Sequence, residues 1–222
     1  MKVNEIFTSI DGEGIRQGYL CSFVRLYGCN LKCNYCDTRY ACEGGKYTEM
    51  TVSQIVSKLN EYHVRNITVT GGEPLLAPEI KQLVAVLAAD GYRINIETNG
   101  SVDYSGIWTD EERKQLGKRL FLTVDYKLPD SGMVRMMKHN CFERLQSDDV
   151  LKFVVQSRND LLAMKYFLMH NPQICSHVYV SPVFGKISPR EIVEFMQEFN
   201  LVDIRIQLQI HKFIWDPATR GV

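Results

Sequence analysis

The sequence predicts an α/β fold in which parallel strands alternate with helices to form an incomplete barrel. Short apolar runs typical of buried strands recur along the chain, and amphipathic segments with the spacing of a helix lie between them. Such alternation with short connections gives parallel strands joined by right-handed crossovers. About six strand–helix units are too few for a closed barrel of eight strands. We therefore expect one domain over residues 1–222, open on one side.

The elements follow one another in order. Capping signals start two of the expected helices: Thr51-Val-Ser-Gln54 is a capping box, and Ser188-Pro189 places an N-cap before a proline at the first helical position. The segment 128–149 is the longest irregular stretch and is expected to be a lid or an insertion. The expected strands are 20–27, 66–70, 92–97, 120–126, 150–155 and 177–183, with alternation again over 204–210, and the other expected helices are 78–91, 110–116 and 159–169.

Composition narrows the class of protein. The 26 basic and 26 acidic residues give a formal net charge of zero, which argues against a nucleic-acid binder. No apolar stretch approaches the roughly 20 residues that span a bilayer, and residues 1–5 lack the apolar region of a secretory signal. Three of the seven cysteines cluster tightly, which is typical of metal-binding thiols in the cytoplasm and not of a disulfide framework.

The clustered cysteines are Cys29, Cys33 and Cys36, spaced C-x3-C-x2-C, with the aromatic Tyr35 just before the last one. A structural zinc site has four protein ligands, and an electron-transfer cubane usually has four thiolates. Three thiolates leave one iron of a four-iron, four-sulfur (4Fe-4S) cluster without a protein ligand. The run resembles the signature of the radical-SAM enzymes, in which S-adenosylmethionine chelates that iron. The alternative is a zinc loop that recruits Cys21, Cys42 or a histidine.

Two further motifs end predicted strands, where barrel enzymes carry their chemistry. Thr70-Gly-Gly-Glu-Pro74 contains two glycines that let the backbone approach a ligand, and its alternative reading is a plain tight turn. It resembles the radical-SAM segment that contacts the amino and carboxylate groups of S-adenosylmethionine. Glu97-Thr-Asn-Gly100 is similar to a second element of that superfamily, although alone it equally fits a polar turn.

A narrower resemblance runs almost from end to end of the chain. The residues 6–14, Phe23-Val-Arg25, Cys36-Asp-Thr38, Thr70-Gly-Gly-Glu-Pro74 and 207–212 together resemble the 7-carboxy-7-deazaguanine synthases. The resemblance implies a lyase of the radical-SAM type with a partial barrel fold. Such an enzyme contracts the ring of 6-carboxy-5,6,7,8-tetrahydropterin to 7-carboxy-7-deazaguanine, with loss of ammonia, in queuosine biosynthesis. It implies a 4Fe-4S cluster, S-adenosylmethionine and Mg2+ as cofactors.

The resemblance also implies roles for single residues. Arg25 offers a planar fork that suits the substrate carboxylate, and its alternative is a surface ion pair. Thr38 supplies a hard oxygen that suits Mg2+, and its alternative is a simple turn residue. Asp11 departs from the family, in which glutamine is common at this position. The implied substrate contacts are Ile10, Asp11, Gly12, Arg25, Thr70 and, weakly because of the tail length, Val222; the cluster ligands are Cys29, Cys33 and Cys36. The implied cofactor contacts are Tyr35, Asp37, Gly72, Asp125, Tyr126, Lys127, Ser181, Pro182, Val183 and Phe184.

Two competing functions share part of this pattern. A glycyl-radical-enzyme activase also uses C-x3-C-x2-C, but it would need a groove for a protein substrate and no pterin pocket. A non-catalytic zinc or iron–sulfur module would explain the cysteines and leave the glycine motif unexplained. The family resemblance further implies a homodimer and an electron donor such as flavodoxin.

Overall fold

The computed structural model describes residues 1–222, and its nine strands form one sheet in the order β3-β1-β2-β4-β5-β6-β7-β8-β9. Every neighbouring pair from β2 to β9 is parallel, while β1 is antiparallel to both β2 and β3. The strands are β1 (Lys2–Ile10), β2 (Leu20–Leu26), β3 (Thr48–Glu49), β4 (Asn66–Gly71), β5 (Arg93–Thr98), β6 (Leu120–Tyr126), β7 (Val150–Val155), β8 (His177–Pro182) and β9 (Ile204–Ile206).

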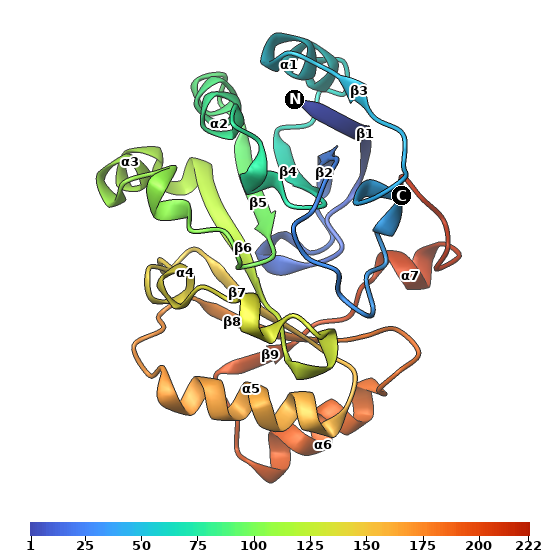
Figure 1. Cartoon of the computed structure of the whole chain (residues 1–222), viewed down its shortest axis with the longest axis vertical. Helices are drawn as coiled ribbons and strands as arrows, with labels where there is room; N and C mark the ends of the chain where they lie inside the picture. The colour runs from blue at the N-terminus through green and yellow to red at the C-terminus, as the bar shows by residue number, and fades with distance from the viewer.

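Helices α1 to α6 lie along the outer side of the curved sheet, whereas α7 lies apart from them on the cavity side (Figure 1). They follow the strands in the order expected of crossover connections, so each parallel strand pair is bridged by a segment that covers the sheet. The helices are α1 (Val52–Asn60), α2 (Ile80–Ala89), α3 (Asp110–Leu116), α4 (His139–Glu143), α5 (Arg158–His170), α6 (Pro189–Glu198) and α7 (His211–Ile214).

Local sequence explains why these helices begin where they do. A capping box starts each of three helices, with Thr51, Thr109 and Ser188 as the N-caps. The side chain of each N-cap residue accepts a hydrogen bond from the backbone N–H three residues later, and the Gln or Glu side chain at that later position accepts one from the N–H of the N-cap residue. Apolar residues then face the sheet at helical spacing, as Ile55 and Leu59 do in α1, where both are fully buried. The predicted helix and strand order is thereby confirmed, and the sheet is open, as expected of a partial barrel.

Seven strands of the sheet are parallel, in agreement with a partial barrel of about six strands, and β1 extends the sheet beside β2 and in turn pairs with β3. Strand β1 was not predicted, since only Val3 and Ser9 in it are buried and its apolar signal is weak. Strand β3 has two residues and both are exposed. At the other end, β9 stops at Ile206, so the alternation over 204–210 predicted a longer strand than forms.

The irregular segment 128–149 folds against the cysteine loop. It contains the short helical turns Pro129–Ser131 and Val134–Met136, followed by α4. The backbone N–H of Asn34 donates to the carbonyl of Ser131 at 3.0 Å, and the Asn34 side chain donates to the carbonyl of Asp130 at 3.0 Å. Residues 130–131 of the segment therefore support the cysteine loop through these hydrogen bonds.

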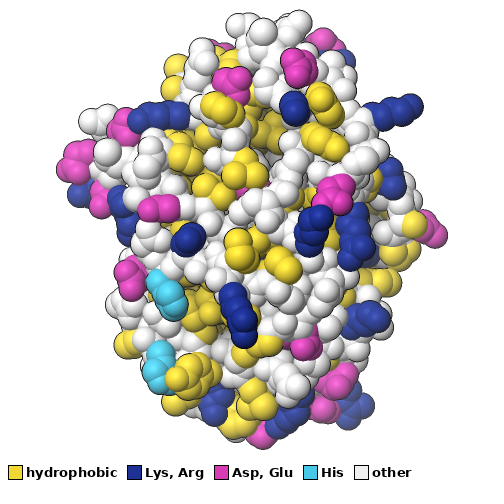
Figure 2. Space-filling model, in the orientation of Figure 1, with side chains coloured by type: hydrophobic (Ala, Val, Ile, Leu, Met, Phe, Trp, Pro, Cys, Tyr) yellow, Lys and Arg dark blue, Asp and Glu magenta, His cyan; other side chains and the backbone are white.

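The charges of the chain are spread over its surface. Figure 2 shows basic, acidic and apolar side chains mixed across one face, without a large patch of either sign. This distribution agrees with the formal net charge of zero. No helix in the structure is both long enough and apolar enough to cross a bilayer.

Candidate active site

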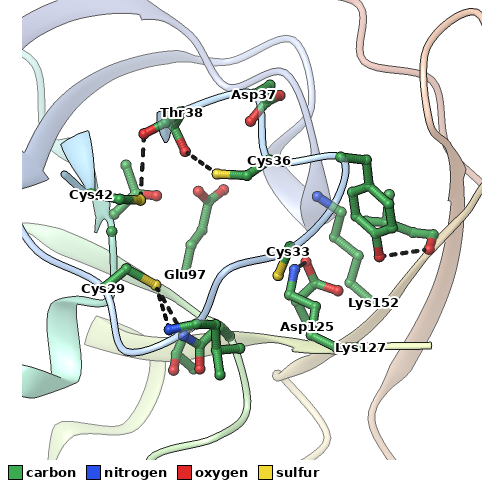
Figure 3. A pocket seen from close by; sticks show the side chains of 18 of the residues that line it. Cys29, Cys33, Cys36, Asp37, Thr38, Cys42, Glu97, Asp125, Lys127 and Lys152 are labelled. Atoms are coloured by element: carbon green, nitrogen blue, oxygen red, sulfur yellow. Dashed lines mark hydrogen bonds and ion pairs between the residues drawn. The ribbon is translucent and has the colours of Figure 1, made fainter. Parts of the chain in front are cut away.

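A cavity of about 300 Å³ lies at the carboxyl ends of the parallel strands, where the cysteine loop covers them (Figure 3). Six successive parallel strands, β2 and β4 to β8, contribute side chains or following residues to its wall, as the barrel rule predicts. The lining residues are Cys29, Leu31, Cys33, Tyr35, Cys36, Asp37, Thr38, Cys42, Thr70, Gly71, Gly72, Glu97, Thr98, Asn99, Thr123, Asp125, Lys127, Lys152, Val154, Val183, Phe184, Gln209 and Lys212.

The three cysteines of the signature come from one loop after β2, and all three line this cavity as free thiols. No three Cys, His, Asp or Glu side chains converge on a point that suits a single metal ion. A single zinc ion would require such convergence, whereas a cluster presents its irons at separate corners and takes one thiolate at each. Three thiols on one loop fit a cluster, with one thiolate to each of three irons.

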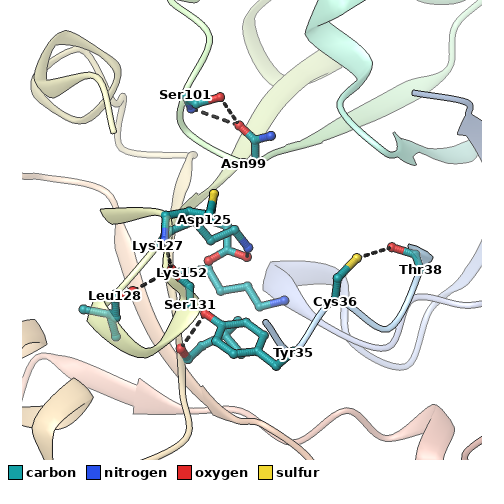
Figure 4. Close-up of polar contacts among 12 residues, drawn as sticks. Tyr35, Cys36, Thr38, Asn99, Ser101, Asp125, Lys127, Leu128, Ser131 and Lys152 are labelled. Atoms are coloured by element: carbon teal, nitrogen blue, oxygen red, sulfur yellow. Dashed lines mark hydrogen bonds and ion pairs between the residues drawn. The ribbon is translucent and has the colours of Figure 1, made fainter. Parts of the chain in front are cut away.

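Neighbouring polar groups hold the cysteine loop in place. The backbone N–H of Leu31 donates to Cys29 Sγ at 3.4 Å, and Asn99 Nδ2 lies 3.6 Å from the same sulfur. Thr38 Oγ1 lies 3.8 Å from Cys36 Sγ, so the threonine hydroxyl faces the cavity beside the last cysteine (Figures 3 and 4). Burial raises the pKa values of Cys29 and Cys33. Coordination to iron would offset this, because a metal stabilises the thiolate.

Glu97, Asp125, Lys127 and Lys152 form the deep wall of the cavity, and the last three belong to two buried ion pairs. Lys127 pairs with Asp125 at 2.5 Å, and Lys152 pairs with Glu13. Glu97 lies among them, and burial raises its pKa to about 7, with Lys152 acting in the opposite direction. Burial by itself would lower the pKa of Lys152, but Glu13, Asp125 and Glu97 outweigh it and the pKa is raised. Both lysines are therefore cationic inside the cavity.

Strand alternation decides which residues of Asp125-Tyr-Lys127 face the cavity. Asp125 and Lys127 line it (Figure 4), whereas the intervening Tyr126 points to the other side of the sheet. The Tyr126 ring packs in an aromatic cluster, with its centroid 4.2 Å from that of Phe167 and 5.0 Å from that of Phe142. The structure thus brings two of these three predicted residues to the site and gives the third ring a packing role.

The glycine motif lines the cavity, but its glycines serve the packing of two loops. A Cβ on Gly72 would stand 2.0 Å from the carbonyl oxygen of Gly28, and one on Gly71 would stand 2.1 Å from that of Leu26. The N–H of Gly72 donates to Leu26 and the N–H of Glu73 donates to Gly28. These two N–H groups are therefore already paired with the backbone of the neighbouring loop.

Contacts among its own residues stabilise the N-terminal loop that follows β1. Both Nε and Nη2 of Arg16 contact Asp11 Oδ2, at 3.1 and 3.0 Å, and the Asp11 N–H donates to the carbonyl of Tyr19. Gly12 packs against His211, since a Cβ on it would lie 2.4 Å from His211 Nδ1. The residues Ile10, Asp11 and Gly12 do not line the cavity.

Arg25 has a partner in the structure. Its Nε donates to Glu5 Oε1 at 2.7 Å, and the Tyr40 hydroxyl donates to the same oxygen at 3.1 Å. Arg25 does not line the cavity, although Glu97 is near enough to help raise its pKa against the effect of burial. Its two Nη groups make no hydrogen bond within the protein. The ion pair joins β2 to β1, and its side chains are only 14% and 24% exposed, so it is not a surface pair.

The remaining predicted residues divide between the cavity and its surroundings. Val183 and Phe184 line the cavity, whereas the two preceding residues, Ser181 and Pro182, are buried behind it. Val222 is half-buried and does not line the cavity.

Several cavity residues were not assigned a role from the sequence. Lys152 could have been identified from the sequence, because it is the one charged residue in the apolar strand 150–155 and such a residue indicates a functional or paired charge. Glu97 belongs to a motif noted in the sequence, and the structure places it in the deep wall. Cys42 also lines the cavity, although it lies outside the cysteine spacing. Lys212 reaches the rim from α7 and lies 3.4 Å from Asp37 Oδ2.

Three thiols on one loop over the carboxyl ends of a partial barrel are the arrangement of a radical-SAM protein. The family model described as the Radical SAM superfamily matches residues 23–139. The fold is similar to that of Streptococcus suis SuiB bound to S-adenosylmethionine, at a TM-score of 0.54 and 14% identity over 84% of this chain and 46% of that one.

The chain belongs to the 7-carboxy-7-deazaguanine synthase family within that superfamily. It is 47% identical to the 7-carboxy-7-deazaguanine synthase of Clostridium acetobutylicum over 100% of this chain and 99% of the relative. The corresponding protein of Methanospirillum hungatei is 37% identical over 98% of this chain and 86% of its own length. The fold also matches the crystal structure of QueE from Escherichia coli, with a TM-score of 0.74 and 21% identity over 93% and 92% of the two chains.

Proposed function

We propose that the protein converts 6-carboxy-5,6,7,8-tetrahydropterin to 7-carboxy-7-deazaguanine and ammonia. The observation that carries the proposal is the cavity lined by the three signature thiols together with buried carboxylates and ammonium groups. Relatives named for this activity cover the whole chain. Membership of this family argues against a glycyl-radical-enzyme activase and against a non-catalytic metal-binding module.

Cys29, Cys33 and Cys36 would hold the 4Fe-4S cluster, and the cavity beside it would hold S-adenosylmethionine. When bound and reduced, the pair supplies a 5′-deoxyadenosyl radical. The protein orients the bound molecules and limits the access of water. Tyr35 is fixed for this purpose, because its hydroxyl donates to the carbonyl of Val154 at 3.2 Å (Figure 4). The other proposed cofactor contacts that line the cavity are Asp37, Gly72, Asp125, Lys127, Val183 and Phe184.

Thr38 and Thr70 serve the substrate side of the cavity in this proposal. Thr38 would contribute its hydroxyl to a Mg2+ ion, which usually keeps several waters and takes few protein ligands. Thr70, at the end of β4, is buried and lines the cavity, so its hydroxyl is placed to contact the substrate. The Nη groups of Arg25, which make no hydrogen bond within the protein, would bind the substrate carboxylate.

The proposal includes a cytoplasmic homodimer that receives electrons from a carrier such as flavodoxin. A reducing compartment suits seven thiols, of which three would bind a cluster. An iron–sulfur cluster that starts each reaction requires a one-electron donor, and a low-potential carrier supplies one.

Anaerobic reconstitution followed by a product assay tests the function. The protein is loaded with iron and sulfide, then incubated with carboxytetrahydropterin, S-adenosylmethionine, Mg2+ and dithionite. We expect 7-carboxy-7-deazaguanine and ammonia in equal amounts. A protein that retains a 4Fe-4S spectrum and cleaves S-adenosylmethionine, but forms no deazaguanine, would contradict the proposal.

A further inference from the structure

Lys152 is a buried cation in the cavity wall to which the proposed function assigns no role. It lies in β7 between Leu151 and Phe153, which are both fully buried. Its ammonium group pairs with Glu13, which lies 139 residues earlier in the chain, and both side chains are only 11% exposed. A buried lysine is costly to keep charged unless it is paired. Loss of the contact with Glu13 would therefore destabilise the charged form of Lys152.

The other charges near Lys152 do not replace Glu13 as its partner. Asp125 is its neighbour across the sheet by strand register, but the Asp125 carboxylate pairs with Lys127. Glu97 is also near, since its charge helps to raise the pKa of Lys152. Among these carboxylates, only Glu13 forms an ion pair with Lys152. Lys152 therefore connects the wall of the cavity with the segment that carries Glu13.

That segment is the N-terminal loop between β1 and β2, residues 11–19. The backbone of Gly14 is paired at both N–H and C=O with the side chain of Gln207, at 2.7 and 3.1 Å. Gln17 Nε2 donates to the carbonyl of Leu208 at 2.8 Å. These contacts tie the loop to the C-terminal segment, whereas Lys152 ties it to the strands. Glu13 Oε1 is buried and makes no hydrogen bond within the protein, so it keeps a free acceptor.

We propose that Lys152 is a positioning residue, which holds Glu13 and with it the N-terminal loop in the geometry that binds the carboxypterin. The inference rests on the proposed function, because it requires the loop to lie on the substrate side of the cavity. It assigns Lys152 no contact with the cluster or with S-adenosylmethionine. The contribution of Lys152 is therefore specific to one of the two small molecules that the cavity binds.

Steady-state kinetics of the reconstituted enzyme separate these effects. In Lys152→Met, we expect the KM for carboxytetrahydropterin to rise about 10–100-fold, because a hydrogen bond between charged groups is lost. The KM for S-adenosylmethionine, the cluster spectrum and the iron content should stay at their wild-type values. Lys152→Arg keeps the charge and should restore part of the loss. Lys186→Met removes an exposed lysine outside the cavity and serves as the matched control.

A double-mutant cycle tests whether Lys152 acts through Glu13. If it does, Lys152→Met should add little to the rise in KM that Glu13→Gln causes alone. Full additivity of the two effects would overturn the inference, as would an unchanged pterin KM in both single variants. A wild-type protein that forms no deazaguanine would instead refute the proposed function, so the two failures are distinguishable.

Discussion

The thiol of Cys42 differs from the three signature thiols in its environment. Burial raises the pKa of Cys42 to about 12, and the nearby Cys36 and Cys29 thiols act in the same direction. Its Sγ donates to the carbonyl of Thr38 at 3.5 Å. A protonated thiol that donates a hydrogen bond is a poor metal ligand, because the thiolate is the form that binds metal. Burial also raises the pKa values of Cys29 and Cys33, so the hydrogen bond to Thr38 and the C-x3-C-x2-C spacing, not the pKa, set Cys42 apart from the three proposed ligands.

Single substitutions of the cysteines test this difference. Alanine at Cys29, Cys33 or Cys36 should abolish retention of the 4Fe-4S cluster, whereas Cys42→Ala should keep the iron content and the visible absorption of the wild type. Iron analysis and ultraviolet-visible spectra after anaerobic reconstitution provide the measurement. Equal loss of iron in Cys42→Ala would show that the three-ligand assignment is wrong.

The hydroxyl of Thr38 is the basis of a second residue-scale prediction. A neutral hydroxyl cannot hold Mg2+ tightly, so substrate oxygens must complete the site. Thr38→Ala should reduce the stimulation of turnover by Mg2+ and leave the cluster spectrum unchanged, because the thiolates are untouched. The response of product formation to Mg2+ concentration measures the effect. Tight binding of Mg2+ to the substrate-free enzyme in calorimetry would rule out this model.

At the scale of single elements, helix α6 shows how local sequence sets a boundary. Ser188 Oγ accepts from the N–H of Glu191 at 3.2 Å, the Glu191 carboxylate accepts from the N–H of Ser188 at 2.9 Å, and Pro189 occupies the first helical position. Ile192 and Phe195 then bury one face of the helix. All of these signals lie within eight residues, which is why the start of α6 was predictable from sequence.

Removal of this cap should lower stability without affecting catalysis. Ser188→Ala should reduce the free energy of unfolding by about 1 kcal/mol, the usual contribution of such a cap. The pterin KM should not change, because Ser188 does not line the cavity. Denaturant unfolding measures the effect, with Ser57→Ala, at an exposed position inside α1, as the control. Equal stability of the Ser188 and Ser57 variants would contradict the capping role.

At the scale of the whole molecule, the two ends of the chain meet beside the cavity. Gln207 is 3% exposed, and its amide completes two hydrogen bonds with Gly14, 193 residues away in the chain. The pairing closes the open side of the partial barrel near the last parallel strand. Neither partner can be satisfied by water at this depth, so the contact should be costly to break.

The variant Gln207→Ala tests this closure. It leaves the N–H and C=O of Gly14 unpaired, and we expect a loss of about 1–3 kcal/mol in the free energy of unfolding. A rise in the pterin KM should accompany the loss, because the N-terminal loop is freed at one of its anchors. Gln197→Ala, at an exposed position of α6, is the control. Wild-type stability and KM in Gln207→Ala would show that the two ends are not coupled.

The sequence by itself determined the features that depend on neighbours in the chain. Periodicity predicted the alternating strands and helices, capping boxes predicted helix starts, and one loop of eight residues carried all three cluster cysteines. The family followed from several such motifs together, and the full-length relatives confirm it. Alternation also allowed either Tyr126 or its two neighbours to face the cavity, but it could not choose between the two faces.

Only the tertiary structure decided how distant residues pair. It added β1 to the sheet, gave Arg25 the partner Glu5, and joined Lys152 to Glu13. It also showed that the N–H groups of Gly72 and Glu73 serve the packing of two loops. The physical reason is that a buried charge or N–H group must find a partner, but the chain does not encode that partner within a few residues. The partner depends on which strands the fold places side by side.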